Sequence, residues 1–231
     1  MKKLLIAIDG PAGAGKTSGS KMLAQRLGYK YIDTGALYRG VGFFAHANGV
    51  AASDNVGLAE FLPKITLNFE HNDNGDLRLL GSGPNVKNQD ISDAIRTPLM
   101  SKWASDVSAQ PSVREWLLGQ QRRMGTEGGA VFEGRDMGTV VFPNADIKFF
   151  ITASPEVRAK RRWNEMSAEA KSKMTFEELL AQINERDYND SHRDIAPLKP
   201  AEDAITIWSD GMTVADSVNA MMIHIGKLNN F

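Results

Sequence analysis

The motif that most constrains how this chain can fold is the sequence GPAGAGKT at Gly10–Thr17. It carries every fixed position of the phosphate-loop pattern G-x-x-x-x-G-K-S/T. An apolar run at 4–8 predicts a buried strand before it, and a helical pattern at 17–27 follows it. Backbone N–H groups of such a loop wrap a polyphosphate, and the helix N-terminus adds partial positive charge. The motif therefore predicts nucleotide binding, with Lys16 reaching the terminal phosphates and Thr17 offering its hydroxyl to Mg²⁺.

The rest of the chain alternates between short apolar runs and helical patterns. The apolar runs predict strands at 4–8, 29–32, 130–132, 147–151 and 204–208. The helical patterns lie at 17–27, 36–48, 155–166, 176–193 and 214–227. This alternation is typical of an α/β fold, so we expect one central sheet of five parallel strands with helices on both faces. Phosphate-binding loops of such folds lie at the carboxyl ends of the strands.

One stretch breaks this alternation. Residues 65–69 alternate apolar and polar side chains, as a half-exposed antiparallel strand does. Asn74-Gly75 is a strong hairpin turn signal, and Leu77 and Leu79 supply the returning strand. Two helical patterns follow, at 91–109 and 112–124, separated by Pro111. We therefore expect a small antiparallel β and helical insertion at 50–103, mounted on a core of 1–49 and 104–231.

The composition excludes several classes of protein. A net charge of −1 gives no overall basic field that would attract nucleic acid or an anionic membrane. The lack of cysteine removes disulfides, thiolate catalysis and Cys-ligated zinc. No apolar run approaches the roughly 18 residues of a membrane helix, and the N-terminus leads straight into a strand rather than a signal peptide. We expect a cytoplasmic protein with small-molecule partners and no obligate protein partner.

Polar groups follow the second predicted strand, at the edge of the sheet that carries the phosphate loop. They are Asp33, Thr34 and Gly35, and Arg39 lies in the next helix. An Asp-Thr pair in this place is often only a helix N-cap, whereas Arg39 can pair bidentately with a second phosphate. The sequence alone leaves both interpretations open.

The third predicted strand runs into Glu133, Gly134, Arg135 and Asp136. A carboxylate at the end of a buried strand beside a phosphate loop is where a metal-orienting acid belongs. Glu133 is therefore a candidate to orient Mg²⁺. Arg135 and Asp136 either bind a ligand or form a local ion pair.

Two predicted helices each present charged side chains on one face. Arg158, Arg161 and Arg162 fall at i, i+3 and i+4 of the first, after a Ser154 cap. Arg186, Asp190 and Arg193 fall at i, i+4 and i+7 of the second. A solvated, salt-laced face explains either pattern taken alone.

The phosphate loop changes the weight of these patterns. Transfer of a phosphoryl group from ATP to another phosphate brings two polyanions together, and each unit-charge pair ~4 Å apart costs about 4 kcal/mol at an effective dielectric near 20. Such chemistry requires several arginines from separate segments. The candidates are Arg39, Arg135, Arg158, Arg162, Arg186 and Arg193. Because a phosphate acceptor is already an anionic nucleophile, no general base is needed, and catalysis consists of positioning and charge stabilisation.

Several segments together resemble the bacterial cytidylate kinases, a family of nucleoside monophosphate kinases. These segments are the phosphate loop, DTGALYR at 33–39, GRDMGTVVFP at 134–143 and ERD at 185–187. The resemblance extends over nearly the whole chain, and the GRDMGTVVFP segment is its most diagnostic part. It implies a central five-stranded parallel sheet, a monophosphate-binding insertion and a short arginine-bearing lid, here at 154–166.

The resemblance also implies roles for individual residues. The catalytic residues are Lys16, Arg135, Arg158 and Arg162. The ATP ligands are Gly10, Pro11, Ala12, Gly13, Ala14, Gly15, Lys16, Thr17 and Ser18, with Thr17 and Glu133 holding Mg²⁺, Glu133 through water. The acceptor phosphate falls to Arg39, Arg135 and Arg193, the ribose side to Arg186 and Asp190, and cytosine to Ser105, Arg114 and Asp136. Asp33, Thr34 and Gly35 complete the CMP-binding set. The substrates implied are ATP with CMP or dCMP.

The chain departs from the family pattern at three places. Glu133 stands where the family usually has aspartate, Thr34 replaces a common serine, and Gly19 lies in the first turn of a helix, at a cost of up to ~1 kcal/mol relative to alanine.

Two alternatives remain. One is a kinase for another nucleoside monophosphate or a small hydroxyl acceptor, for which Asp33 is the obvious candidate base. The other is a phosphate-loop switch that hydrolyses ATP or GTP, although the guanine-reading motif N-K-x-D does not occur in the sequence.

Overall fold

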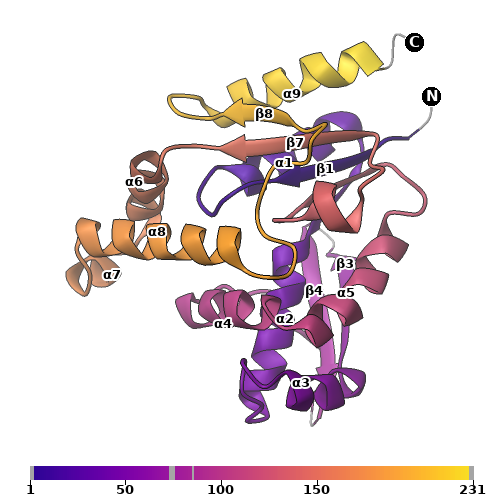
Figure 1. Ribbon diagram of the computed structural model, residues 1–231, viewed down its shortest axis with the longest axis vertical. Coiled ribbons are helices and arrows are strands. Elements are labelled where there is room, and N and C mark those ends of the chain that lie inside the picture. Colours follow the sequence, from indigo (N-terminus) through magenta and orange to yellow (C-terminus); the bar gives the residue numbers. More distant parts are fainter. Residues whose placement is uncertain (1–2, 73–75, 85, 229–231) are drawn as a thin grey trace. The chain divides into compact units, whose positions relative to one another are not determined.

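The structure is a computed structural model that describes residues 3–72, 76–84 and 86–228. The chain divides into two compact units. We call Met1–Tyr31 with Glu127–Phe231 the core unit, and Ile32–Thr126 the hairpin unit. Figure 1 shows the helices and strands of both.

One parallel sheet of five strands is built mainly from the core unit. Its strands are β1 (Leu5–Asp9), β2 (Lys30–Asp33), β6 (Ala130–Glu133), β7 (Ile147–Thr152) and β8 (Ile205–Trp208). They lie in the order β2-β6-β1-β7-β8, which places β1 and the phosphate loop after it at the centre. All five predicted strands are confirmed, with ends that differ by one residue at most. Continuous apolar runs form these strands because both faces of a parallel sheet are covered.

Helices of the core unit flank this sheet. They are α1 (Lys16–Leu27), α6 (Pro155–Glu165), α7 (Ala168–Ser172), α8 (Phe176–His192) and α9 (Val214–Leu228). Helix α1 packs against α9 and β6, and α6 packs against α8 around Ala159, Leu179 and Ile183. A short π-helical segment, η2 (Met137–Val141), contacts β1 and was not predicted. The predicted helices of this unit are otherwise confirmed; only the five-residue α7 was missed.

The hairpin unit combines a three-stranded antiparallel sheet with helices. The strands β3 (Thr66–His71), β4 (Leu77–Gly83) and β5 (Val86–Asp90) lie in this order in the sheet. The helices are α2 (Thr34–Ala47), α3 (Asn55–Phe61), η1 (Leu62–Lys64), α4 (Pro98–Ser108) and α5 (Pro111–Met124). Their apolar faces share one buried cluster that includes Val41, Phe44, Leu67, Leu79 and Ile91.

The predicted hairpin strands are confirmed, since β3 and β4 pair from Thr66 opposite Ser82 to His71 opposite Leu77. The predicted Asn74-Gly75 turn lies outside the described residues. Strand β5 and helix α3 were missed, because VKNQD at 86–90 has no apolar alternation and α3 is only seven residues long.

The predicted helix at 91–109 is wrong over its first third. Helix α4 begins only at Pro98, because proline fits the first position of a helix but not its interior. The Thr97 side chain caps it by accepting from the Met100 amide at 3.1 Å. The predicted helix at 112–124 is confirmed as α5, which begins one residue earlier, at Pro111. The predicted division into a kinase core, 1–49 with 104–231, and a monophosphate-binding insertion, 50–103, stays a prediction. None of the helices formed by the described residues is long and apolar enough to cross a membrane.

Candidate active site

The phosphate loop joins β1 to α1 in a conformation that requires glycine. Gly10, Gly13 and Gly15 all have positive φ angles, and a Cβ on Gly10 would lie 1.9 Å from the Ile151 carbonyl oxygen. Alanine at Gly10 would therefore push β1 and β7 apart. Helix α1 begins at Lys16, so its N-terminus faces the loop, as anion binding requires.

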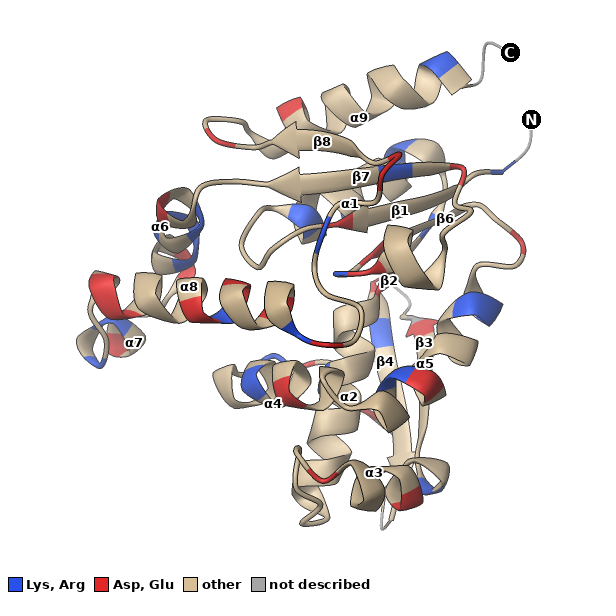
Figure 2. Cartoon of the chain, in the orientation of Figure 1, with Lys and Arg blue, Asp and Glu red and all other residues tan. Residues whose placement is uncertain are grey.

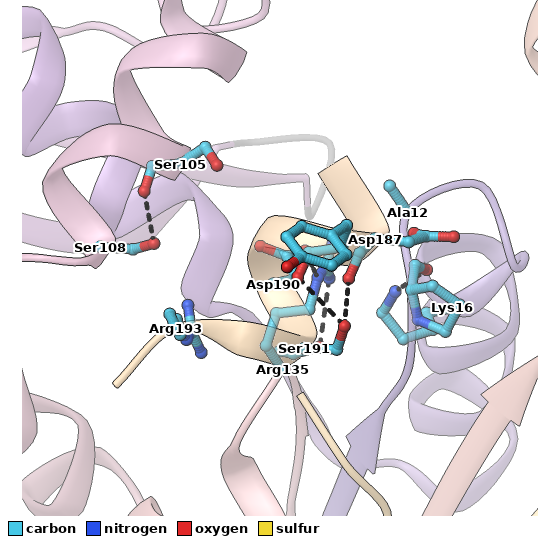
Figure 3. Close-up of polar contacts among 12 residues, drawn as sticks. Ala12, Lys16, Ser105, Ser108, Arg135, Asp187, Asp190, Ser191 and Arg193 are labelled. Carbon is cyan, nitrogen blue, oxygen red and sulfur yellow. Dashed lines mark hydrogen bonds and ion pairs between the residues drawn. The ribbon is translucent and has the colours of Figure 1, made fainter. Parts of the chain in front are cut away.

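Lys16 is buried within this loop, and its Nζ donates to the Pro11 carbonyl at 2.6 Å (Figure 3). The pKa of Lys16 lies well below its ordinary value, first because burial disfavours the ammonium ion and next because the Arg135 charge is near. The Arg186 charge acts in the same direction, while Glu133 and Asp9 oppose it. A polyphosphate would remove this repulsion, so the loop is built to receive an anion.

Thr17 and Glu133 place two side-chain oxygens next to each other at the phosphate loop. The Thr17 hydroxyl donates to Glu133 Oε1 at 2.8 Å, and Glu133 ends β6 next to Ile8 of β1. Mg²⁺ is commonly bound by one carboxylate, phosphate oxygens and water, so these two residues fit that ion. In the described part of the chain, no three acidic or histidine side chains cluster as a self-sufficient metal site.

A partly buried ion pair joins the segment after β6 to helix α8. Arg135 Nε donates to Asp190 Oδ2 at 2.9 Å (Figure 3). Burial pushes the pKa of Asp190 upward, but the charges of Arg135 and Arg186 outweigh it, and the pKa falls below its ordinary value. The alternative interpretation of a solvated helix face is therefore wrong for Asp190. Arg135 forms an ion pair with this residue, 55 positions along the chain.

Helix α8 carries Arg186 and Asp190 at the predicted spacing and has both acidic and basic residues along its length (Figure 2). Arg193 follows the last helical residue and its Nε donates to the Ala196 carbonyl at 2.8 Å. The Arg193 charge also lowers the pKa of Asp190, so Arg186 and Arg193 both stabilise the Asp190 carboxylate.

The three arginines of α6 differ more than their spacing indicated. Arg158 is 3% exposed and donates to the Ala153 carbonyl at 2.9 Å, the Ala12 carbonyl at 3.1 Å and both carboxylate oxygens of Asp187. The solvated-face interpretation is wrong for Arg158 and holds for Arg162, which is exposed. Ser154 is the N-cap residue of α6, as predicted, but its side chain makes no capping hydrogen bond. Its amide instead donates to Asp210 Oδ1 at 2.9 Å.

The sequence does not indicate a role for Arg161 in the site. It donates to the Ser209 carbonyl at 2.5 Å and to Ser209 Oγ at 3.0 Å, and that hydroxyl donates to the Ala14 carbonyl at 3.1 Å. Arg158 and Arg161 thus hold two carbonyls of the phosphate loop from one helix. Their i, i+3 spacing was the only available signal, whereas nothing near Ser209 indicated its role.

In the hairpin unit, Asp33 and Arg39 form an ion pair at 2.7 Å. Asp33 Oδ1 also accepts from the Ala36 amide at 3.1 Å, so the cap interpretation is confirmed. Thr34 is buried and Gly35 half-buried beside this pair. Arg39 can still turn toward a phosphate, since its side chain is about a quarter exposed.

The predicted cytosine ligands come from both units. Arg114 is buried on α5, donates to the Ser108 carbonyl at 3.1 Å and lies over the Tyr38 ring, 5.9 Å from its centroid. The Ser105 carbonyl accepts from Ser108 Oγ at 2.8 Å (Figure 3). Asp136 is buried in the core unit, at the N-terminus of η2. Their joint action on one base stays a prediction.

Comparison with known proteins identifies the family. A model of the family described as cytidylate kinase matches residues 6–227. A cytidylate kinase of Geobacter sp. strain M21 is 45% identical, over 94% of this chain and 91% of that protein. One of Fervidobacterium nodosum is 42% identical, over 94% of both. A crystal structure of an uncharacterized protein from Eubacterium ventriosum shares the fold, with a TM-score of 0.50, 13% identity, and coverage of 98% of this chain and 99% of that one. The chain belongs to the cytidylate kinase family, a family of phosphotransferases.

Proposed function

We propose that this protein transfers the γ-phosphoryl group of ATP to CMP or dCMP, giving ADP and the corresponding diphosphate. The observation that carries the proposal is the crowding of cations at the phosphate loop. Lys16 is buried where Arg135 and Arg186 both repel its charge, while Glu133 and Asp9 act in the opposite direction. Such an arrangement gains free energy when polyanions bind, and it gains most when two phosphates approach each other.

The ATP side is the phosphate loop, from Gly10 to Ser18. Its amides and Lys16 would hold the β- and γ-phosphates, and Thr17 with Glu133 would hold Mg²⁺. The metal, when bound, supplies charge neutralisation at the phosphoryl oxygens. Glu133 already reaches the Thr17 hydroxyl, so the longer side chain that replaces the family's aspartate can fill this role directly or through water.

The acceptor side is proposed from residues of both units. Arg39, Arg135 and Arg193 would bind the acceptor phosphate, Arg186 and Asp190 the ribose side, and Asp33, Thr34 and Gly35 the adjoining part of CMP. Because the acceptor phosphate is already an anionic nucleophile, the protein's task is to neutralise and align it. The Arg135–Asp190 pair supports this assignment, because it fixes the direction of the guanidinium before any substrate binds.

Base selection is assigned to Ser105, Arg114 and Asp136. Cytosine offers an amino donor beside ring acceptors, so a carboxylate and an arginine can read it. Arg114 and Asp136 are both buried, so their charges would act on a bound base with little screening by water.

The lid arginines are proposed to act on the transition state. Arg162 is exposed and free to move toward a bound nucleotide, whereas Arg158 would supply its charge from the loop that it supports. Either substitution to alanine should lower kcat by more than it raises the KM for the acceptor.

A hydroxyl acceptor is disfavoured by the state of Asp33. A general base needs a free carboxylate near the transfer point, but Asp33 is engaged by Arg39 and by the Ala36 amide. We further propose that the protein works in the cytoplasm on small-molecule substrates alone.

A panel of nucleoside monophosphates with ATP, scored for ADP release, tests the proposal. We expect CMP and dCMP to give the highest kcat/KM. A metabolite hydroxyl or another monophosphate as the best acceptor would contradict the substrate assignment, and ADP release without any acceptor would favour a nucleotide switch.

A further inference from the structure

Two buried charged side chains in the core unit have no part in the chemistry above. Asp9 ends β1 and is 4% exposed, and Lys148 lies on β7 and is 6% exposed. In the parallel pairing of these strands, Ala7 lies opposite Lys148 and Asp9 opposite Phe150. Asp9 and Lys148 therefore project from the same face of the sheet.

Asp9 holds the start of the segment 136–143, which begins with Asp136 and directly follows Arg135. Its two carboxylate oxygens accept from the backbone amides of Met137 at 2.8 Å and Gly138 at 2.7 Å. These amides begin η2, where helical geometry supplies no acceptor from within the helix. A carboxylate from a distant strand thus does the work of a helix cap, through two charge-assisted bonds.

Lys148 holds the end of the same segment. Its Nζ donates to the Pro143 carbonyl at 2.5 Å and to Asp203 Oδ1 at 2.8 Å. Asp203 is largely exposed, so the Pro143 bond is the part of this arrangement that lies inside the protein.

Gly138 lies directly against both side chains. A Cβ at this position would come within 3.1 Å of Lys148 Cδ and 3.4 Å of Asp9 Oδ2. The middle of the segment therefore lies against the same two side chains that bond to its ends.

Burial of charge is a poor way to gain stability. Two buried ionised groups lose their hydration, and apolar residues of similar size commonly serve as well or better. Such groups are better explained by the position that they impose. Asp9 immediately precedes the phosphate loop, and the held segment begins with Asp136, directly after Arg135. One carboxylate therefore links the end of the ATP-binding strand to the place in the chain where two proposed acceptor ligands lie.

We propose that Asp9 and Lys148 are positioning residues, which fix the segment 136–143 at both ends and thereby set where Arg135 and Asp136 meet the acceptor nucleotide. This inference rests on the proposed function of that pair. Neither side chain touches substrate in this account; each acts through the backbone of the segment.

Lys148→Met tests the proposal, because it keeps an unbranched stem and removes the bond to Pro143. We expect the KM for CMP to rise by about tenfold and the preference for CMP over UMP to shrink, with the KM for ATP unchanged. The matched control is Asp203→Asn, which weakens the exposed ion pair and leaves the Pro143 bond; it should behave as wild type. Asp9→Asn replaces one acceptor oxygen by a donor facing a backbone amide, and it should lower kcat as well as raise the KM for CMP.

If Lys148→Met does not fold, Gly138→Ala provides a second test, because the added Cβ would press on Lys148 Cδ at 3.1 Å and on Asp9 Oδ2 at 3.4 Å, the two side chains that hold the segment. A folded Lys148→Met or Gly138→Ala protein whose CMP KM and CMP-to-UMP preference match those of Asp203→Asn would overturn the proposal. Failure of the proposed function is a separate result, because it would appear in the wild-type protein as a lack of preference for CMP.

Discussion

Several candidate site residues of the core unit and of the hairpin unit are held in different ways. In the core unit, three of these contacts join residues far apart in sequence: Thr17 with Glu133, Arg135 with Asp190 and Arg158 with Ala12. In the hairpin unit, two of them join near neighbours: Asp33 with Arg39 and Arg114 with Ser108. Contacts between distant segments disappear only when the fold opens, whereas local contacts can exchange within one element. The comparison indicates a preformed ATP side and acceptor ligands in the hairpin unit that can adjust.

Lys16→Ala should have the largest effect on activity. The amine is buried in the loop and meets the terminal phosphates as charge develops, so kcat should fall by roughly 10³-fold while the protein stays folded. Turnover at saturating ATP and circular dichroism measure the two parts. Near-normal turnover would contradict both the phosphate-loop assignment and the inference of a preformed ATP side.

The pH dependence of stability should reveal Asp9. Burial raises the pKa of Asp9 from 3.8 to about 6, so between these values the native state holds a proton that the unfolded chain releases. The unfolding free energy therefore falls as pH rises through this window, by about 3 kcal/mol for this group. Urea unfolding of wild type and Asp9→Asn at pH 4 and pH 7 measures the difference. If the unfolding free energy changes equally with pH in the two proteins, burial does not raise the pKa of Asp9.

The ion pairs Arg158–Asp187 and Arg39–Asp33 should differ in their effect on stability. Arg158→Ala leaves two buried carbonyls and the Asp187 carboxylate without a donor, so we expect a loss of about 2–3 kcal/mol in unfolding free energy. Arg39→Ala removes a partly exposed, local pair and should cost less than about 1 kcal/mol. Arg162→Ala is the matched control on α6, with unchanged stability. Equal losses for Arg158 and Arg39 would contradict the distinction between the two units.

Asp136→Ala should reduce base selection. UMP presents a carbonyl where CMP presents an amino group, so a buried carboxylate would face an acceptor with no proton between them, at a cost of roughly 1–3 kcal/mol. Wild type should prefer CMP by at least about tenfold in kcat/KM. The variant should lose that preference by damaging CMP turnover rather than by improving UMP. An unchanged ratio would move base reading to other residues.

The sequence was sufficient for the parallel sheet because each strand is a continuous apolar run between helical patterns. It was also sufficient for the phosphate loop, whose glycines and lysine have few other uses. It could not predict β5, whose polar residues gain strand geometry only by pairing with β4. It could not separate Arg158 from Arg162, since spacing on a helix does not say which neighbour covers it. Asp9 and Ser209 were missed because their partners, Met137, Gly138 and Ala14, are backbone groups far along the chain.

The most direct test of phosphoryl transfer to CMP is ³¹P NMR of a mixture of ATP, Mg²⁺, CMP and the protein. We expect one CDP to form for each ADP, with little free phosphate, and we expect neither CDP nor ADP to form with Lys16→Ala. ADP and free phosphate without CDP would contradict it, because water rather than CMP would then be the acceptor.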